Sequence, residues 1–277
     1  MKKAIKVWSQ VNIKEIGYGE IEDFLLAQKG VSDKTKANLR SCLNDFWTWL
    51  RKRKVLTLQE MPELPVVHFE SELRKTIERS QQVAVLDEIK KISYEINPRI
   101  WIGIKWLMTY ISIRPGELVK IREGDIKLEG RCLLIPHPKE KKPKSIPLRD
   151  EDLQLVKSMP RGFPELPFFR HISGRQGCKI GEAFGHEYLA RYWKEACQNL
   201  GIKDVCLYAG TKHSSACNMD NTPEEVKRAT MHKSNKSFER YYTMKDEKLR
   251  EIYNAPWENQ PDNALTTVFK TESESKA

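Results

Sequence analysis

The chain has 277 residues, which is long enough for one large domain or for a large and a small one. Its net charge is +10, and residues 251–277 hold two basic and five acidic residues, so the first 250 residues carry +13. This excess suits a nucleic-acid partner, through phosphate neutralisation and counterion release, although a basic protein without such a partner has the same composition. No stretch approaches the roughly 20 apolar residues of a membrane span, and the amino terminus lacks the apolar run of a signal peptide, so we expect a cytoplasmic protein.

The amino-terminal residues predict a small helical unit. "YGEIEDFLLAQKG" is typical of a short helix closed by Gly30. Ser32 is a suitable N-cap for a second, amphipathic helix. Its apolar positions recur at i, i+4, i+7 and i+11, at Leu39, Leu43, Phe46 and Leu50.

A basic run, Arg51, Lys52, Arg53 and Lys54, ends this helix. These side chains could lie along a phosphate backbone, or they could form a solvated helix end that complements the helix dipole. Beyond them, Pro62 and Pro65 oppose a regular helix. We therefore predict a small helical domain over 1–60, a linker over 61–79, a larger domain over 80–256 and a loose polar tail over 257–277.

The larger domain is predicted to be mainly α with a small β-sheet, an α+β fold. "QQVAVLDEIKKISYEI" and "RIWIGIKWLMTYIS" favour helices, the second apolar enough to be mostly buried. Apolar runs at 132–135 and 145–147 flank a connection rich in lysine and proline, which predicts strand, turn and strand. "GEAFGHEYLARYWKEACQNLG" predicts a further helix with a glycine stop.

The six cysteines are scattered, without a C-x-x-C pair or a Cys/His cluster at zinc-finger spacing. We expect them to be reduced and mostly structural, and we expect no metal and no cofactor. They are Cys42, Cys132, Cys178, Cys197, Cys206 and Cys217.

Four stretches resemble one family, the tyrosine recombinases (phage integrases). "YISIRPGELVKIREGDI" resembles the first arginine box, "HPKEKKPKSIPL" the lysine-bearing β-hairpin, "YAGTKHSSA" the second box, and "MHKSNKSFERYY" the stretch ending in the nucleophile. Their order and approximate spacing agree over residues 80–245. Residues 20–56 resemble the second half of the family's core-binding domain, so the resemblance implies that this DNA-gripping domain is only partial here.

The resemblance implies cleavage and rejoining of double-stranded DNA by a site-specific recombinase or integrase of a prokaryotic mobile element. Tyr241 would attack the phosphodiester to give a 3′-phosphotyrosine and a free 5′-hydroxyl. Arg114, Lys212 and His232 would hold the phosphate, and Lys139 would protonate the leaving oxygen. Neither ATP nor metal is required, because the covalent link keeps the bond energy, and a homo-tetramer on DNA is implied.

The residues themselves suit this chemistry. A phosphodiester under attack develops negative charge, which needs fixed cations and a proton donor. The planar fork of Arg114 can grip two phosphate oxygens, and Pro115 early in a helix would hold it in place, although an ordinary turn arginine has the same local sequence.

Tyr241 and Tyr242 would point roughly 100° apart on a helix, so only one can face a phosphate. In the alternative reading both are packing residues and His232 is a satisfied polar residue.

The hairpin lysine is ambiguous in register. Lys139 lies eight positions before Pro147, at the family's position. Lys141, Lys142 and Lys144 are expected on the same tip, where a slip of one or two residues would promote one of them, or the whole tip could be a solvated loop. Lys141 and Lys142 are also predicted DNA contacts, with Arg51, Lys52 and Arg53.

The second box departs from the family, which mostly has histidine, two residues and arginine where this chain has Ala209 and Lys212. The lysine side chain keeps the positive charge but lacks the planar guanidinium that can hold two phosphate oxygens, and the alanine side chain cannot form a hydrogen bond. His213 follows Lys212 directly and should project from another helix face. An alternative function is therefore a recombinase-derived DNA-binding protein with weakened or lost catalysis. A third is a nicking enzyme resembling type IB topoisomerases.

Overall fold

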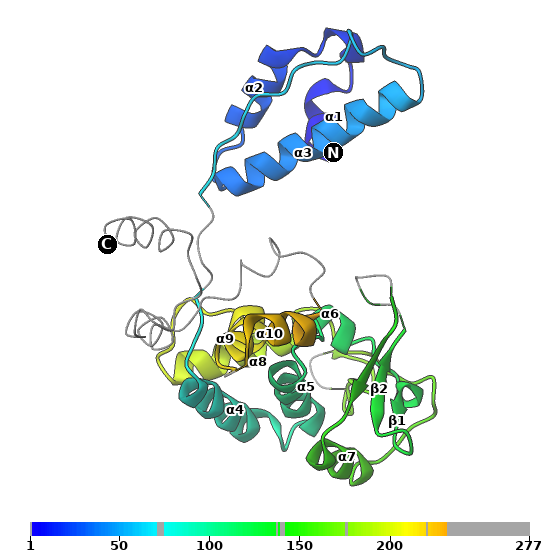
Figure 1. The fold of residues 1–277 in the computed structure, drawn as a ribbon, viewed down its shortest axis with the longest axis vertical. Coiled ribbons are helices and arrows are strands. Elements are labelled where there is room, and N and C mark those ends of the chain that lie inside the picture. Colours follow the sequence, from blue (N-terminus) through cyan, green and yellow to red (C-terminus); the bar gives the residue numbers. More distant parts are fainter. Residues whose placement is uncertain are drawn as a thin grey trace, which may run out of the picture. The chain divides into compact units, whose positions relative to one another are not determined.

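The computed structural model describes residues 2–70, 75–136, 138, 142–174, 177–219 and 221–231. Lys139, Lys141, His232, Tyr241, Tyr242 and the tail 257–277 therefore lie outside the described residues. The chain divides into two compact units, Met1–Glu72 and Leu73–Ala277 (Figure 1). No helix of the described residues is long and apolar enough to cross a membrane.

The first unit is helical, as predicted. Ser32 caps the longest helix, because its side chain accepts a hydrogen bond from the Thr35 amide, and Gly30 supplies the positive φ of +72° just before it. The preceding helix ends earlier than expected, at Leu26. The elements are α1 (Lys2–Trp8), η1 (Ile13–Glu15), α2 (Tyr18–Leu26) and α3 (Asp33–Lys52).

Aromatic packing holds this unit together. Trp47 of α3 is fully buried. The centroid of the Trp8 ring of α1 lies 4.9 Å from the centroid of the Phe24 ring and 6.2 Å from that of the Trp47 ring. The helix α1 was not predicted, although Ala4 and Trp8 are four residues apart and share one helix face. The side chains that complete the core are Ile16, Ile21, Leu25, Leu43, Leu50 and Leu56.

The second unit is built around three helices that the sequence predicted, α4 (Arg79–Ser93), α5 (Pro98–Thr109) and α8 (Tyr188–Asn199). In the structure these helices pack on one another. The central α5 is capped by the Asn97 side chain and buries most of its residues. Gly201, at φ +67°, stops α8. The shorter elements are α6 (Pro115–Leu118), η2 (Glu123–Asp125), α7 (Asp150–Lys157), η4 (Ala209–His213), α9 (Ser214–Cys217) and α10 (Pro223–Thr230).

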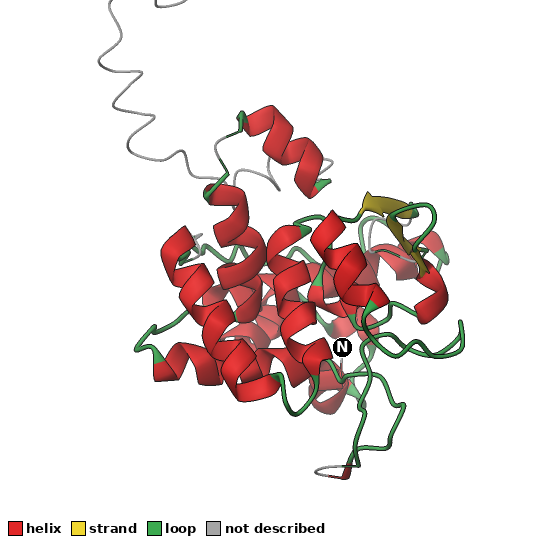
Figure 2. Ribbon diagram, turned by 90° about the horizontal axis from the view of Figure 1, so that it is seen from below, coloured by secondary structure: helices red, strands yellow, loops and turns green. Residues whose placement is uncertain are grey.

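A small antiparallel sheet lies to one side of these helices (Figure 1, Figure 2). Its strands, in spatial order, are β1 (Ile126–Lys127), β2 (Cys132–Ile135) and β3 (Lys144–Pro147), and Leu133 pairs with Ile146 on the buried face. The two-residue β1 was not predicted. The placement of Lys144 on an exposed hairpin tip was wrong, because Lys144 begins β3 and is 4 % exposed.

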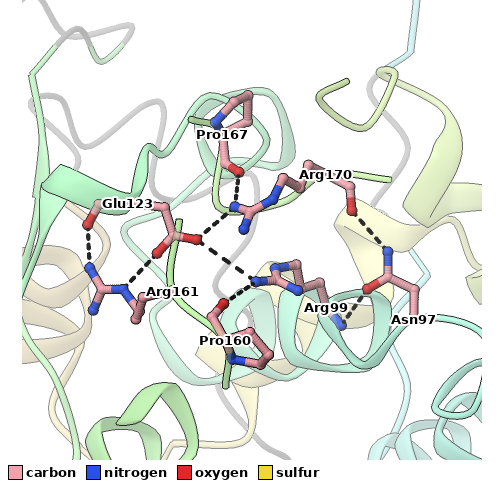
Figure 3. A network of polar contacts seen from close by, with 7 residues as sticks. All are labelled: Asn97, Arg99, Glu123, Pro160, Arg161, Pro167 and Arg170. Atoms are coloured by element: carbon pink, nitrogen blue, oxygen red, sulfur yellow. Dashed lines mark hydrogen bonds and ion pairs between the residues drawn. The ribbon is translucent and has the colours of Figure 1, made fainter. Parts of the chain in front are cut away.

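A buried carboxylate, that of Glu123, forms ion pairs with α5 and with the segment that follows α7. Glu123 of η2 has no exposed surface, and its oxygens lie 2.6 Å from Arg161 Nε, 2.6 Å from Arg170 Nη1 and 3.8 Å from Arg99 Nη2 (Figure 3). Burial and the neighbouring Arg170 charge lower the pKa of Arg99 to about 10. Removing one partner would leave buried charge uncompensated, so the cluster fixes the segment after α7 against α5.

The cysteines are all free thiols. Only Cys197 is buried, and burial raises the pKa of its thiol to about 11. The expectation that the cysteines are reduced agrees with this, and the other five side chains are at least partly exposed.

Candidate active site

Arg114 occupies a fixed position at the start of α6. It is the N-cap residue, and Pro115 is the first residue of the helix, as "RPGEL" predicted. The Glu117 carboxylate accepts a hydrogen bond from the Arg114 backbone amide at 3.2 Å and another from Arg114 Nη1 at 3.1 Å. The Arg114 side chain keeps 23 % of its surface exposed. The guanidinium is thus oriented by the helix and still reachable.

Glu117 also connects α6 to the sheet. Lys144 Nζ lies 3.0 Å from Glu117 Oε2 and donates a second hydrogen bond, at 2.9 Å, to the carbonyl of Ser112. Sequence reasoning did not single out Glu117. The signal was present, because an acidic residue three positions after an N-cap is the spacing of a capping box. The pairing with Lys144, 27 residues away, had no such signal.

A cavity of about 620 Å³ opens beside Arg114. Pro138, which is buried and directly precedes Lys139, lines this cavity, and so does Tyr208, which directly precedes η4. The cavity therefore brings together the first box, the hairpin and the approach to the second box. Glu117, Lys120 and His186 also line it. Lys120, His186 and Tyr208 were not singled out from the sequence, since only the tertiary fold brings them to this place.

The second box forms a π-helix, η4, in which Ala209, Lys212 and His213 are all buried. Its wide turn is supported by the Ser214 hydroxyl, which donates to the Ala209 carbonyl at 2.9 Å, and by Gln82 Nε2 of α4, which donates to the Gly210 carbonyl at 2.8 Å. Single π-turns inside helices occur frequently at functional sites. Lys212 is 2 % exposed, and this burial was not anticipated.

Gly210 lets η4 approach α8. A Cβ atom at this position would lie 1.9 Å from Cζ2 of Trp193, whose indole is itself held by a 2.9 Å hydrogen bond to the Val205 carbonyl. The predicted direction of His213 assumed α-helical spacing, which the π-helix does not have. His213 is 1 % exposed and its ring packs edge to face on Tyr208, 4.7 Å between centroids.

Among the comparisons with known proteins, the solved structures show the fold. No protein-family model matches the sequence, and no curated protein sequence matches it significantly. Several solved structures match. A XerH site-specific recombinase bound to a palindromic difH substrate, after cleavage, gives a TM-score of 0.66 at 20 % identity, over 93 % of this chain and 76 % of that one.

The Tn1549 transposon integrase with transposon right end DNA gives a TM-score of 0.65 at 16 % identity, over 91 % of each chain. A lambda integrase dimer bound to a COC′ core site gives 0.63 at 14 % identity, over 95 % of this chain and 73 % of that one. The chain has the fold of the tyrosine recombinases.

Within this fold, the predicted DNA contacts that lie among the described residues are exposed. Arg51, Lys52 and Arg53 lie at the end of α3 in the first unit, and the Arg53 guanidinium lies 5.4 Å above the Trp49 ring. Lys142 is exposed in the hairpin connection of the second unit. These cations are accessible to a polyanion, in contrast to the buried Lys144 and Lys212.

Proposed function

We propose that this protein cleaves and rejoins DNA strands at specific sites through a 3′-phosphotyrosine intermediate. One observation carries the proposal. Arg114, oriented by Glu117, lines a cavity that also contains the residues next to Lys139 and next to η4, in the fold of recombinases that were solved with DNA. A cation held at the wall of such a cavity suits a phosphodiester, whose charge grows as it is attacked.

In the proposed reaction the phenolic oxygen of Tyr241 attacks the scissile phosphorus. A tyrosine–phosphorus bond forms as the phenol releases its proton to solvent, the bond to the 5′-oxygen breaks, and Lys139 gives a proton to that oxygen. Arg114, Lys212 and His232 offset the negative charge on the nonbridging oxygens. Rejoining is the reverse attack by a 5′-hydroxyl, so neither ATP nor a metal ion is required.

The DNA would be held largely through its phosphates. The +13 charge of the first 250 residues supports this, and so does the exposure of Arg51, Lys52 and Arg53. Lys141 and Lys142 of the hairpin would add contacts. In this proposal residues 1–60 grip DNA, 61–79 connect, 80–256 carry the catalysis, 257–277 form a tail, and four copies assemble on the DNA.

The alternative is a DNA-binding protein with weakened or lost cleavage, and the second box favours it. Ala209 presents only a methyl group, 5 % exposed, where the family mostly has a histidine. Lys212 offers a point charge in place of a fork that could hold two phosphate oxygens. The two altered positions fall in the same π-helix, so the loss is concentrated on one side of the site.

Trapping a covalent adduct tests the proposal. Duplexes that the protein binds are first selected from a randomised pool, and the selected site is then nicked beside the scissile phosphate so that the cleaved strand diffuses away. We expect the wild-type protein to form a denaturant-resistant adduct. Tyr241→Phe should abolish the adduct and leave binding within a few-fold, because it removes only the nucleophilic oxygen. Tyr242→Phe is the matched control and should retain the adduct.

Each other outcome has a definite meaning. Specific binding without any wild-type adduct supports the DNA-binding alternative. Peptide mapping that finds the phosphate on Tyr242 would show that the nucleophile was misassigned. Relaxation of supercoiled plasmid by monomeric protein would indicate a nicking enzyme that resembles type IB topoisomerases and needs no assembly.

A further inference from the structure

The amino group of Lys144 is buried and takes no part in the chemistry proposed above. Its side chain is 3 % exposed, and it does not line the cavity beside Arg114. Burying an ammonium group costs several kcal/mol unless it is paired and hydrogen-bonded. Two partners of the Lys144 amino group, the Ser112 carbonyl and the Glu117 carboxylate, belong to the segment that leads into and forms α6.

The Glu117 carboxylate contacts both Arg114 and Lys144. Oε1 accepts from the Arg114 guanidinium at 3.1 Å, while Oε2 accepts from the Arg114 backbone amide at 3.2 Å and lies 3.0 Å from Lys144 Nζ. One carboxylate therefore fixes both the backbone and the charged end of Arg114. Lys144, anchored in β3, fixes that carboxylate in turn.

The charges of these three groups matter as much as their geometry. The charges of Arg114 and Glu117 sum to zero, so the carboxylate that orients the guanidinium would also weaken its attraction for a phosphate. Lys144 adds a positive charge beside Glu117, so the charges of these three side chains sum to +1. Glu117 and Lys144 are both more than nine-tenths buried, where charges are screened far less than at the surface.

We infer that Lys144 is a positioning residue of the proposed active site: it compensates Glu117, so that Glu117 can orient Arg114 without neutralising it. The inference rests on the proposed function in taking a DNA phosphodiester as the ligand of Arg114. A purely structural Lys144 would have a different signature, because losing a structural lysine lowers stability and slows cleavage of a charged and an uncharged substrate alike.

The test uses two neutral replacements of Lys144 in the full-length protein. Lys144→Met removes the charge and the hydrogen bonds, and Lys144→Gln removes the charge while keeping a donor, which provides a second variant if the first does not fold. Lys127→Met is the matched control, since Lys127 is an exposed lysine in β1 of the same sheet. Circular dichroism and thermal unfolding establish that each variant is folded.

Single-turnover cleavage is then measured, with binding saturated, on the nicked site and on the same site with a methylphosphonate at the scissile position. The methylphosphonate has one nonbridging oxygen replaced by a methyl group, so it carries no charge. Loss of a well-placed oxyanion donor typically costs roughly 10²- to 10³-fold, and Lys144 acts indirectly, so we expect a slowing of about 10- to 100-fold on the phosphodiester. The slowing on the methylphosphonate should be at least several-fold smaller.

A double variant separates charge from packing. Glu117→Gln added to Lys144→Met removes the carboxylate that Lys144 compensates, and it should recover part of the lost phosphodiester rate. Non-additivity of this kind is expected of groups that act as a unit. Equal slowing on the two substrates, or a double variant no faster than Lys144→Met, would overturn the inference, since either result assigns Lys144 to the scaffold alone.

A separate readout distinguishes this inference from the proposed function. The Nε–Hε signal of Arg114, assigned by Arg114→Lys, can be followed in ¹⁵N-labelled protein without DNA. Lys144→Gln should shift this signal and increase its mobility, while Lys127→Met should not. If the wild-type protein cleaves neither substrate, the proposed function fails and the Arg114 signal alone decides. An unchanged signal in Lys144→Gln would then refute the positioning role.

Discussion

The two boxes of the candidate site fix their cations by different means. Arg114 is held by side-chain charges, through Glu117 and then Lys144, and stays partly exposed beside a cavity. Lys212 is buried in a π-helix whose shape depends on backbone packing, with Gly210 against Trp193. The first arrangement can be altered without refolding the chain. Substitutions in the second should act on stability before they act on chemistry.

Gly210→Ala should have the largest effect, because the added methyl group would lie 1.9 Å from the Trp193 ring. Overpacking a core costs about 1–3 kcal/mol and occasionally more, and here the ring is hydrogen-bonded in place, so we expect roughly 3 kcal/mol or more. Gly116→Ala in α6 is the matched control, since its methyl group meets nothing within 4 Å. Denaturant unfolding measures both. If both variants lose equally little free energy of unfolding, close packing of Gly210 against Trp193 is not what fixes η4.

Arg114→Lys tests the other half of the comparison. Lysine keeps the charge but cannot bond Glu117 and a phosphate with one planar fork. Losing one oriented donor costs roughly 10²- to 10³-fold in rate, and the retained charge places the expected loss at about 10²-fold. Single-turnover cleavage gives the rate, and thermal unfolding should change little. A large fall in stability would mean that the first box, too, is held by packing.

The same contrast explains what the sequence could predict. Features fixed by neighbouring residues were anticipated: the Ser32 cap, the apolar spacing of α3, the buried α5, the two main strands and the start of α6 at Pro115. The order of the four motifs also predicted the fold, and the solved structures match it.

Features that depend on distant partners were missed. The pairing of Lys144 with Glu117 and the cluster around Glu123 join residues far apart in the sequence, and no local pattern distinguishes a buried lysine from one on a loop. The π-helix was missed because "YAGTKHSSA" satisfies an α-helical reading. Its wide turn depends on Gln82 and Trp193, which lie on two other helices.

A third group of cations, at the end of α3, can be compared with the cations of the two boxes. Arg51, Lys52 and Arg53 are exposed at the end of α3, where Arg53 lies over the Trp49 ring, whereas Lys212 is buried. Replacing all three by glutamate should weaken DNA binding and lower stability only modestly, by about 1–3 kcal/mol in total, because the carboxylates would stand at the carboxy-terminal end of α3. Each lost phosphate contact should flatten the slope of log affinity against log salt by about 0.9. Affinities measured across a salt series test this. An unchanged slope would place these side chains on a solvated face.

Lys212→Arg should have the smallest effect, and its direction decides how the second box is understood. A guanidinium can bond two phosphate oxygens where an ammonium offers a point charge, so cleavage should be faster. The gain is bounded at roughly tenfold, because an oriented donor is worth roughly 10²- to 10³-fold and the charge is already present. The larger group must also enter a site that is 2 % exposed, which should cost about 1 kcal/mol of stability.

The measurement compares four proteins by single-turnover cleavage with DNA saturating: wild type, Lys212→Arg, Ala209→His and the double variant, each corrected for its folded fraction. Ala209→His alone should help less, because an imidazole assists only when the phosphate is already held. If both act as a unit, the double variant should exceed the product of the singles. If Lys212→Arg is fully folded but cleaves more slowly, the π-helix is built around lysine. The second box would then be a working variant and not a weakened one. Four inert proteins would leave DNA binding as the function.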